Sequence, residues 1–167
     1  MTKEEIRNFA YDTIANYLFE NHSDFGYHLY DAIRLGGTIE DAVESYLKEN
    51  HKYIEPKILD SLSDTAMKWD GTFQDCGKVF VLACDLVADY CGVEVLFPIE
   101  TIVEFTNIRD NMKMGFISVE ECANKIADKV KEKMWRPSIH LIDRVLDLVG
   151  LPKFVDCIDT KDLYLSR

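Results

Sequence analysis

Apolar residues recur every three or four positions along most of the chain, which is the spacing of one face of an α-helix. The longest such stripe runs through residues 3–21 and consists of Ile6, Phe9, Ala10, Ile14, Tyr17 and Leu18. Two capping boxes, Thr2-x-x-Glu5 and Thr38-x-x-Asp41, precede this stretch and residues 39–50. Because a capping box satisfies N–H groups at the start of a helix, both stretches are predicted to be helical.

Residues 73–91, FQDCGKVFVLACDLVADYC, are apolar on most faces. A helix of this kind is surrounded by other helices instead of lying on a surface. We therefore predict that residues 73–91 form the central element of the fold and that Gly92 ends it. The following VEVLF segment, residues 93–97, alternates like a strand but has no evident partner strand, so it is predicted to be an extended linker.

The remaining helices are bounded by serine, proline and glycine signals. They are predicted between Ser23 and Gly36, from Pro56 to Gly71, from Pro98 to about Asn111, from Ser118 to about Trp135, and from Ser138 to Gly150, with Pro152 opening a short last turn. The connections are too short to act as linkers between domains. The sequence thus predicts an all-α fold: one domain, residues 1–167, built as a bundle of about seven or eight helices around the central apolar helix.

Composition adds limits to this picture. The 167-residue chain is 47% hydrophobic, which is enough for a well-buried core. Its longest apolar run, VFVLAC at 79–84, is too short to cross a membrane, and the N-terminus lacks the apolar stretch of a signal peptide. Three of the five cysteines, Cys76, Cys84 and Cys91, follow one helix face at a spacing too wide for a disulfide. We expect a cytoplasmic protein with free, mostly buried thiols and no membrane contact.

Residues 110–121, DNMKMGFISVEE, have the acid, glycine, serine and glutamate spacing of an EF-hand calcium loop. Two of the side-chain ligand positions are occupied by Met112 and Met114, whose thioethers are poor ligands for Ca²⁺. The same matches are explained by one helix that ends at Gly115 and a second that is capped by Ser118. The stretch is therefore predicted to be a turn between helices and not a calcium site.

Charge is the one unusual feature of the composition. The formal net charge is −11, from 30 acidic and 19 basic side chains. Direct binding of nucleic acid requires clustered lysine and arginine, so this charge argues against it. A negative surface is compatible with a positively charged protein partner. Acidic surfaces also keep proteins soluble, and the charge alone leaves that simpler interpretation open.

Two pairs of acids lie at i, i+4 spacing, Glu40 with Glu44 and Asp85 with Asp89, so each pair shares a helix face. If the two faces met, four carboxylates would converge as they do in the metal centres of helical bundles. The EDAVE segment is similar to the acid motif of all-α nucleotide pyrophosphohydrolases, but the second motif of that family has i, i+3 spacing and DLVAD has i, i+4. Alternatively, Asp85 and Asp89 mark the exposed strip of an otherwise buried helix.

Aromatic residues are plentiful in the first third of the chain, and most fall on the stripes predicted to be buried. Tyrosines that fall off these stripes and lie beside acids make good protein-binding surfaces, because they bury a large area while ordering few rotamers. The candidate partner-binding residues of this kind are Tyr11, Tyr27, Tyr30, Glu40, Asp41 and Glu44.

Two functions from different classes fit these patterns. In the first, the chain is a non-catalytic acidic module, without metal or cofactor, that binds a protein with a basic surface. It would act as an inhibitor that masks a nucleic-acid-binding surface, and it is similar in size and charge to immunity proteins and phage anti-defence inhibitors. In the second, Glu40, Glu44, Asp85 and Asp89 bind magnesium and hydrolyse a nucleotide or another phosphate ester. The first is preferred because no catalytic motif is complete: the chain has no GxSxG, GxxxxGK, GxGxxG or HExxH segment.

Overall fold

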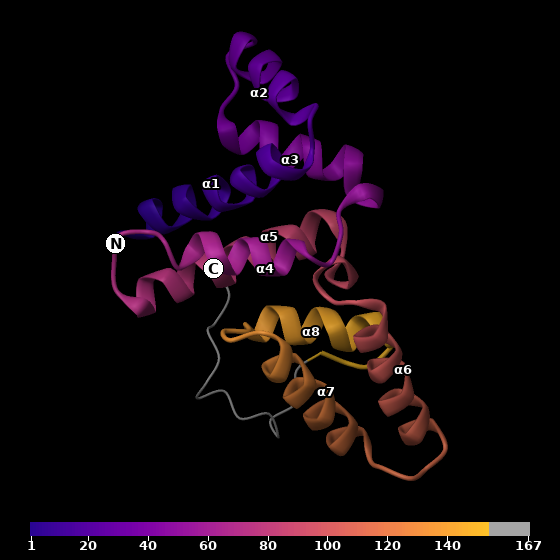
Figure 1. Ribbon diagram of the computed structural model, residues 1–167. Helices are drawn as coiled ribbons and strands as arrows, with labels where there is room; N and C mark the ends of the chain where they lie inside the picture. Colours follow the sequence, from indigo (N-terminus) through magenta and orange to yellow (C-terminus); the bar gives the residue numbers. More distant parts are fainter. Residues whose placement is uncertain (154–167) are drawn as a thin grey trace. The chain divides into compact units, whose positions relative to one another are not determined.

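The computed structural model describes residues 1–153, and this part of the chain is built from α-helices and two short 3₁₀ helices without any β-strand (Figure 1). The elements are α1 (Lys3–Asn21), α2 (Phe25–Arg34), α3 (Ile39–Asn50), η1 (His51–Tyr53), α4 (Ile58–Ala66), α5 (Phe73–Cys91), η2 (Val93–Leu96), α6 (Ile99–Lys113), α7 (Val119–Lys133) and α8 (Ile139–Leu148). The predicted all-α bundle of seven or eight helices is therefore confirmed. The predicted last turn at Pro152 falls mostly outside the described residues.

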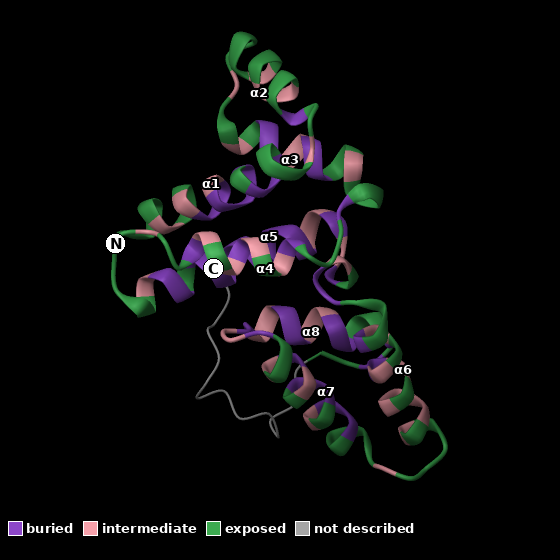
Figure 2. Ribbon diagram, viewed as in Figure 1, coloured by how far each residue is buried: buried purple, intermediate pink, exposed green. Residues whose placement is uncertain are grey.

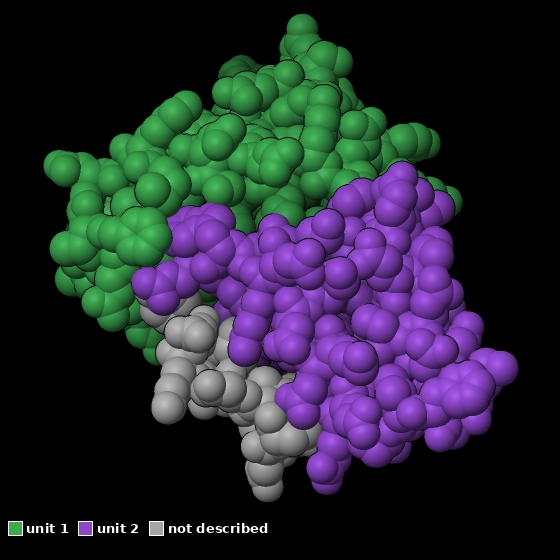
Figure 3. Space-filling model, turned by 60° about the horizontal axis from the view of Figure 1, so that its bottom comes forward, with its two compact units in different colours: residues 1–96 green, residues 97–167 purple. Residues whose placement is uncertain are grey.

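The chain forms two compact units, which we call unit 1 (residues 1–96) and unit 2 (residues 97–167) (Figure 3). Unit 1 holds α1 to α5 with both 3₁₀ helices, and unit 2 holds α6 to α8. The boundary lies between η2 and Pro98, in the segment between the stop signal Gly92 and the start of α6. That the whole chain acts as a single domain stays a prediction.

Helix α5 is the central element of unit 1. It packs against α1, α3 and α4 and against both 3₁₀ helices. Thirteen of its 19 residues are buried (Figure 2), as the apolar sequence on most of its faces predicts. The position of the apolar helix at 73–91 is therefore confirmed for unit 1.

The ends of the helices follow local sequence signals. Both predicted capping boxes form: the side chains of Thr2 and Thr38 accept hydrogen bonds from the backbone N–H groups of Glu5 and Asp41, each at 3.1 Å. One cap differs from the prediction, because α2 begins after Asp24 instead of Ser23 and has no side-chain cap. The carboxylate of Asp24 is instead occupied by a hydrogen bond from α3, which is described below.

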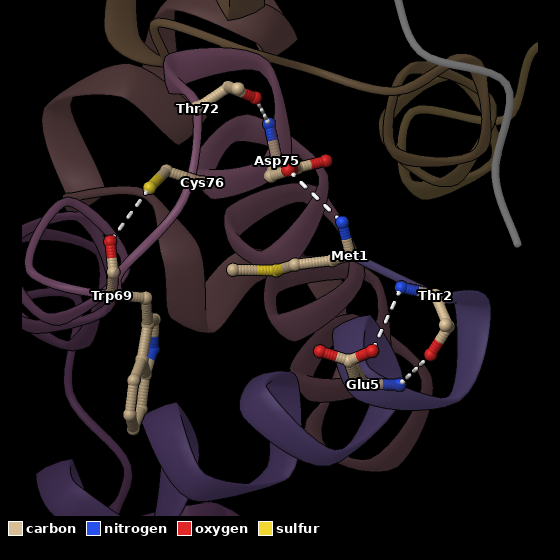
Figure 4. Close-up of polar contacts among 7 residues, drawn as sticks. All are labelled: Met1, Thr2, Glu5, Trp69, Thr72, Asp75 and Cys76. Carbon is tan, nitrogen blue, oxygen red and sulfur yellow. Dashed lines mark hydrogen bonds and ion pairs between the residues drawn. The ribbon is translucent and has the colours of Figure 1, made fainter.

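Residues at the start of the chain contact the segment that connects α4 to α5 and the first turn of α5 (Figure 4). The Met1 ammonium lies 3.3 Å from Asp75 Oδ2, and the backbone N–H of Asp75 donates to Thr72 Oγ1 at 3.1 Å. The indole N–H of Trp69 donates to Thr13 Oγ1 at 2.8 Å, and the ring lies 4.5 Å from that of Phe9 in α1. These contacts join α1 to the segment between α4 and α5.

The prediction of an extended linker at 93–97 is wrong, because residues Val93–Leu96 form the 3₁₀ helix η2. Gly92, at φ +98°, ends α5 and lets the chain change direction. A 3₁₀ helix places residues i and i+3 on the same side, so Val93 and Leu96 are both buried. An alternating strand would place these two residues on opposite faces.

In unit 2, α7 packs against both α6 and α8. The rings of Phe97 and Phe105 meet edge to face at 5.4 Å. The Lys129 ammonium of α7 lies 2.8 Å from Glu104 of α6, and this ion pair holds the pKa of Glu104 below its usual value. None of the described helices, in either unit, combines the length and the apolar character that a bilayer span requires.

Candidate protein-binding surface

The structure separates the six candidate partner-binding residues into two groups. Tyr27 and Tyr30 lie on α2 and are 79% and 67% exposed. Tyr11, Glu40 and Glu44 instead belong to a network of polar contacts inside unit 1, and Asp41 is exposed but closes the capping box of α3. Only the first group offers free aromatic surface to a partner.

Helix α2 is held on α3 by one of its faces. Phe25 is fully buried, and its ring meets those of Phe19 and Tyr46 edge to face at 4.9 and 5.3 Å. His28 Nε2 and Ser45 Oγ are hydrogen-bonded at 2.7 Å. Because residues 25 and 28 share a helix face, these contacts leave the face that carries residues 26, 27 and 30 turned to solvent, where the ribbon of α2 is largely exposed (Figure 2).

The exposed face of α2 carries an open groove, which we call the α2 groove. It has a volume of about 430 Å³ and is lined by Ser23, Gly26, Tyr27 and Tyr30. Gly26 has an ordinary helical conformation, and a Cβ atom at this position would meet nothing within 4 Å. The side chains of Ile33 and Leu35, farther along the same segment, are also exposed. Several exposed large apolar side chains on one short segment are typical of interaction sites.

Two carboxylates lie close along the chain to the residues that line the groove, one directly before α2 and one within it. Asp24 precedes Tyr27 by three residues and Asp31 follows it by four, so both lie on or near the face of Tyr27. The hydroxyl of Tyr46 donates to Asp24 Oδ1 at 2.6 Å and holds the pKa of Asp24 below its usual value. Asp31 lies 3.7 Å from the guanidinium of Arg34. Asp24 is therefore ionised at neutral pH.

The surroundings of the groove are strongly acidic. Unit 1 contains 18 acidic and 8 basic residues, a net charge of −10 out of −11 for the whole chain. Twelve of these 18 acidic residues are exposed. Of the other six, five are half-buried and Asp85 is buried.

The expectation that Tyr11 faces a partner is wrong. Tyr11 is 2% exposed, and its hydroxyl donates to Glu44 Oε1 at 2.7 Å. Burial and this hydrogen bond raise the pKa of Tyr11, and burial with Glu44 also raises that of Tyr90 in α5. Arg7 of α1 pairs with Glu40 and lies over the Tyr11 ring, 5.4 Å from its centroid. Glu40 and Glu44 thus serve contacts among α1, α3 and α5.

The interpretation of Asp85 and Asp89 as an exposed strip is also wrong. Asp85 is completely buried and Asp89 is half-buried. Within residues 1–153, no group of three or more His, Cys, Asp or Glu side chains is arranged so that it could hold a metal ion. The four carboxylates of the magnesium alternative, on α3 and α5, are therefore not assembled into a metal site. The periodicity of a sequence predicts which acids share one face of a helix. It does not predict which other helix packs against that face.

The EF-hand-like stretch is a helix–turn–helix junction. Helix α6 continues to Lys113, so Asp110 and Met112 lie within the helix, and Asp110 Oδ1 lies 2.9 Å from the guanidinium of Arg109. Gly115 has a φ of +81°, and Ser118 caps α7 by accepting a hydrogen bond from the N–H of Glu121 at 3.1 Å. The helix stop and the cap that the sequence predicts are both confirmed.

The described part of the chain contains four cysteines. Cys76, Cys84, Cys91 and Cys122 are free and buried, as predicted. Burial raises the pKa of Cys84 well above its usual value and that of Cys91 to about 12. Because the thiolate is the nucleophilic form, these shifts disfavour nucleophilic reactivity of Cys84 and Cys91 at neutral pH.

Sequence reasoning missed Gly26 and Ile33 on α2 and Leu35 directly after this helix. A signal was present for Ile33, because α2 has two apolar stripes. Phe25, Leu29 and Ala32 form one stripe, and Tyr27, Tyr30 and Ile33 form the other. A short helix whose neighbours lie on one side can bury only one of two such stripes.

Comparisons of the chain with protein-family models, with curated protein sequences and with solved structures gave no significant match. The all-α class is thus defined by the helices themselves.

Proposed function

We propose that this chain is a non-catalytic protein-binding module that uses the exposed face of α2, within its acidic unit 1, to bind a protein with a basic surface. In this proposal it acts as an inhibitor: it covers a surface that its partner otherwise uses to bind nucleic acid. The observation that carries the proposal is the exposure of Tyr27 and Tyr30 on a helix of a unit whose net charge is −10.

Aromatic side chains and charge have different roles in this proposal. Exposed tyrosines are frequent hot spots, because a rigid ring buries a large area at a small entropic cost. The acidic surroundings speed the encounter with a basic partner and favour it over neutral or acidic proteins. A basic surface that recognises nucleic acid is complementary to the same distribution of negative charge.

The magnesium-dependent hydrolase is the weaker alternative. Two of its four carboxylates have other contacts in the structure, since Glu40 pairs with Arg7 and Glu44 accepts from Tyr11. No observation in the described part of the chain favours it over the binding module.

The test begins with capture of partners from a nuclease-treated lysate of the source organism on the immobilised chain, with elution in a salt gradient. Each captured protein is then purified, and its affinity is measured by calorimetry at about 50 and 300 mM salt, with and without competing nucleic acid. We expect an affinity that falls as the salt concentration rises and binding that nucleic acid inhibits by competition. Binding should be lost in a Tyr27→Ala/Tyr30→Ala double variant.

The matched control is Tyr53→Ala, because Tyr53 lies on η1 outside the α2 groove and has a similar exposure of 68%. This variant should bind like the wild type. A partner whose affinity is independent of salt, or is lost equally in the control variant, would contradict the proposal.

A further inference from the structure

We propose that the α2 groove receives an arginine side chain of the basic partner, with the guanidinium stacked on Tyr27 or Tyr30 and paired with Asp24 or Asp31. This inference rests on the proposed function and names the chemistry that the groove selects. It predicts a preference for arginine over lysine at equal charge that depends on the rings of Tyr27 and Tyr30.

The shape of the groove suits one inserted side chain. Tyr27 and Tyr30 are neighbours at i, i+3 on the exposed face, and Gly26 leaves the space beside them open. The volume of about 430 Å³ lies near the small end of the range for ligand sites. The side chains of Tyr27 and Tyr30 are 79% and 67% exposed, so a planar group can reach a ring face.

The same chain already holds a guanidinium by this combination of groups. Arg7 lies over the ring of Tyr11, 5.4 Å from its centroid, and pairs with the carboxylate of Glu40. A tyrosine face with a nearby carboxylate is therefore an arrangement that binds arginine within unit 1. The rings of Tyr27 and Tyr30 line the α2 groove, and the carboxylates of Asp24 and Asp31 lie three and four residues from Tyr27, so the same two kinds of group are present for a side chain from outside.

The preference for arginine follows from its chemistry. The guanidinium is planar and weakly hydrated, so it stacks on an aromatic ring and forms paired hydrogen bonds with a carboxylate. The lysine ammonium is a compact and strongly hydrated charge that does neither as well. A site made only of exposed carboxylates keeps the advantage of paired hydrogen bonds but lacks the stacking on a ring, so its preference for arginine is smaller.

Arg34 provides an internal check on this idea. It lies on α2 four residues after Tyr30, and its guanidinium is 3.7 Å from Asp31. An incoming arginine would compete with Arg34 for this carboxylate. Replacing Arg34 with glutamine should therefore strengthen binding of an arginine ligand, whereas a role of α2 that depends on the Arg34–Asp31 pair would be weakened.

The experiment uses the full chain and two synthetic peptides, (Gly-Ser-Arg)₄ and (Gly-Ser-Lys)₄, which carry equal charge. Binding is measured by fluorescence anisotropy at about 50 mM salt. We expect the arginine peptide to bind roughly three- to tenfold more tightly, the range that one cation–π contact supports. The preference should fall in Tyr27→Leu/Tyr30→Leu, which lacks the stacking contribution, and persist unchanged in the control Tyr53→Leu.

Filling the groove gives a second and independent readout. Gly26→Leu places a side chain in open space on a helix, where leucine has the higher helix propensity, so the fold should be retained or stabilised. Circular dichroism checks this directly. The variant should weaken arginine-peptide binding several-fold, and Arg34→Gln should strengthen it.

The outcomes separate this inference from the proposed function. If both peptides bind with equal, salt-dependent affinity and the groove variants have no effect, the arginine site is wrong and the acidic binding module stands. If neither peptide binds at about 50 mM salt, both the site and the proposed function lose their support.

Discussion

Units 1 and 2 are both helical, but they differ in charge and in aromatic content. Unit 1 carries 18 acidic and 8 basic residues, whereas unit 2 carries 12 and 11, so their net charges are −10 and −1. Thirteen of the 19 aromatic residues also belong to unit 1. The overall charge of −11 is therefore not a general property of the surface, and it is concentrated in the part of the chain that exposes Tyr27 and Tyr30.

Exposed apolar side chains alone do not distinguish the two units. Unit 2 also exposes large ones, among them Ile99, Met114 and Phe116. In unit 2, however, they lie in a segment of nearly balanced charge. The combination of exposed rings and excess negative charge, and not either feature alone, therefore singles out α2 as the candidate surface.

The largest expected effects come from removing core rings, which tests whether the two units unfold separately. Phe80 in α5 and Phe105 in α6 are both fully buried. Replacing either with alanine should lower the free energy of unfolding by about 3–5 kcal/mol. Hydrogen exchange should show the loss of protection confined to α1–α5 for Phe80→Ala and to α6–α8 for Phe105→Ala. Equal loss of protection in both units would show that they unfold as a single cooperative domain.

A smaller loss of stability is expected when a hydrogen bond in the polar network of unit 1 is removed. Tyr11→Phe removes the hydrogen bond to Glu44 and should lower the free energy of unfolding by about 1–2 kcal/mol. Tyr30→Phe removes an exposed hydroxyl and should change it by less than about 0.5 kcal/mol. Urea denaturation measures both. Similar values for the two variants would mean that the buried network does not stabilise unit 1.

One carboxylate in each unit is expected to contribute to the acid sensitivity of that unit. The folded-state pKa values of Asp24 and Glu104 lie below their usual values because of Tyr46 and Lys129, respectively. Each group therefore stabilises the fold above its ordinary pKa, 3.8 or 4.5, and loses this contribution as the pH falls through the lower folded value. Unfolding measured from pH 6 to pH 3 should be less pH-dependent in Asp24→Asn and Glu104→Gln. An unchanged dependence of unfolding on pH in these variants would show that the two contacts do not stabilise the folded state.

The smallest expected effect is that of magnesium. A site that binds Mg²⁺ at about 100 times its Kd would stabilise the folded state by about 2.7 kcal/mol and raise the melting temperature by several degrees. We expect no shift beyond that of a NaCl control at equal ionic strength. A magnesium-specific rise in melting temperature that Asp89→Asn abolishes would support the hydrolase alternative and assign a metal site to unit 1.

The helices were predictable because their signals are local. Thr2, Thr38 and Ser118 bond to an N–H three residues away, and Gly92 and Gly115 end helices through their own φ values. Such signals act within one turn and do not depend on the rest of the fold. The same holds for the central helix, where the apolar sequence alone requires burial.

The candidate site was less predictable because it depends on which helices meet. Tyr11 falls off the main stripe of α1, yet α3 supplies Glu44 as its partner and buries it. Asp85 was expected at a surface and is buried. Tyr27 and Tyr30 were identified, but only the packing of Phe25 against Tyr46 decides that their face of α2 is the exposed one.

The contact of Trp69 with Phe9 and Thr13 also supplies a natural optical probe. The chain contains two tryptophans, Trp69 in unit 1 and Trp135 in unit 2. Phenylalanine at one of these positions leaves a single indole whose emission reports on its own unit. In Trp135→Phe, the wavelength and quenching of the remaining fluorophore would follow the docking of α1 beside α4 in real time, without any attached dye.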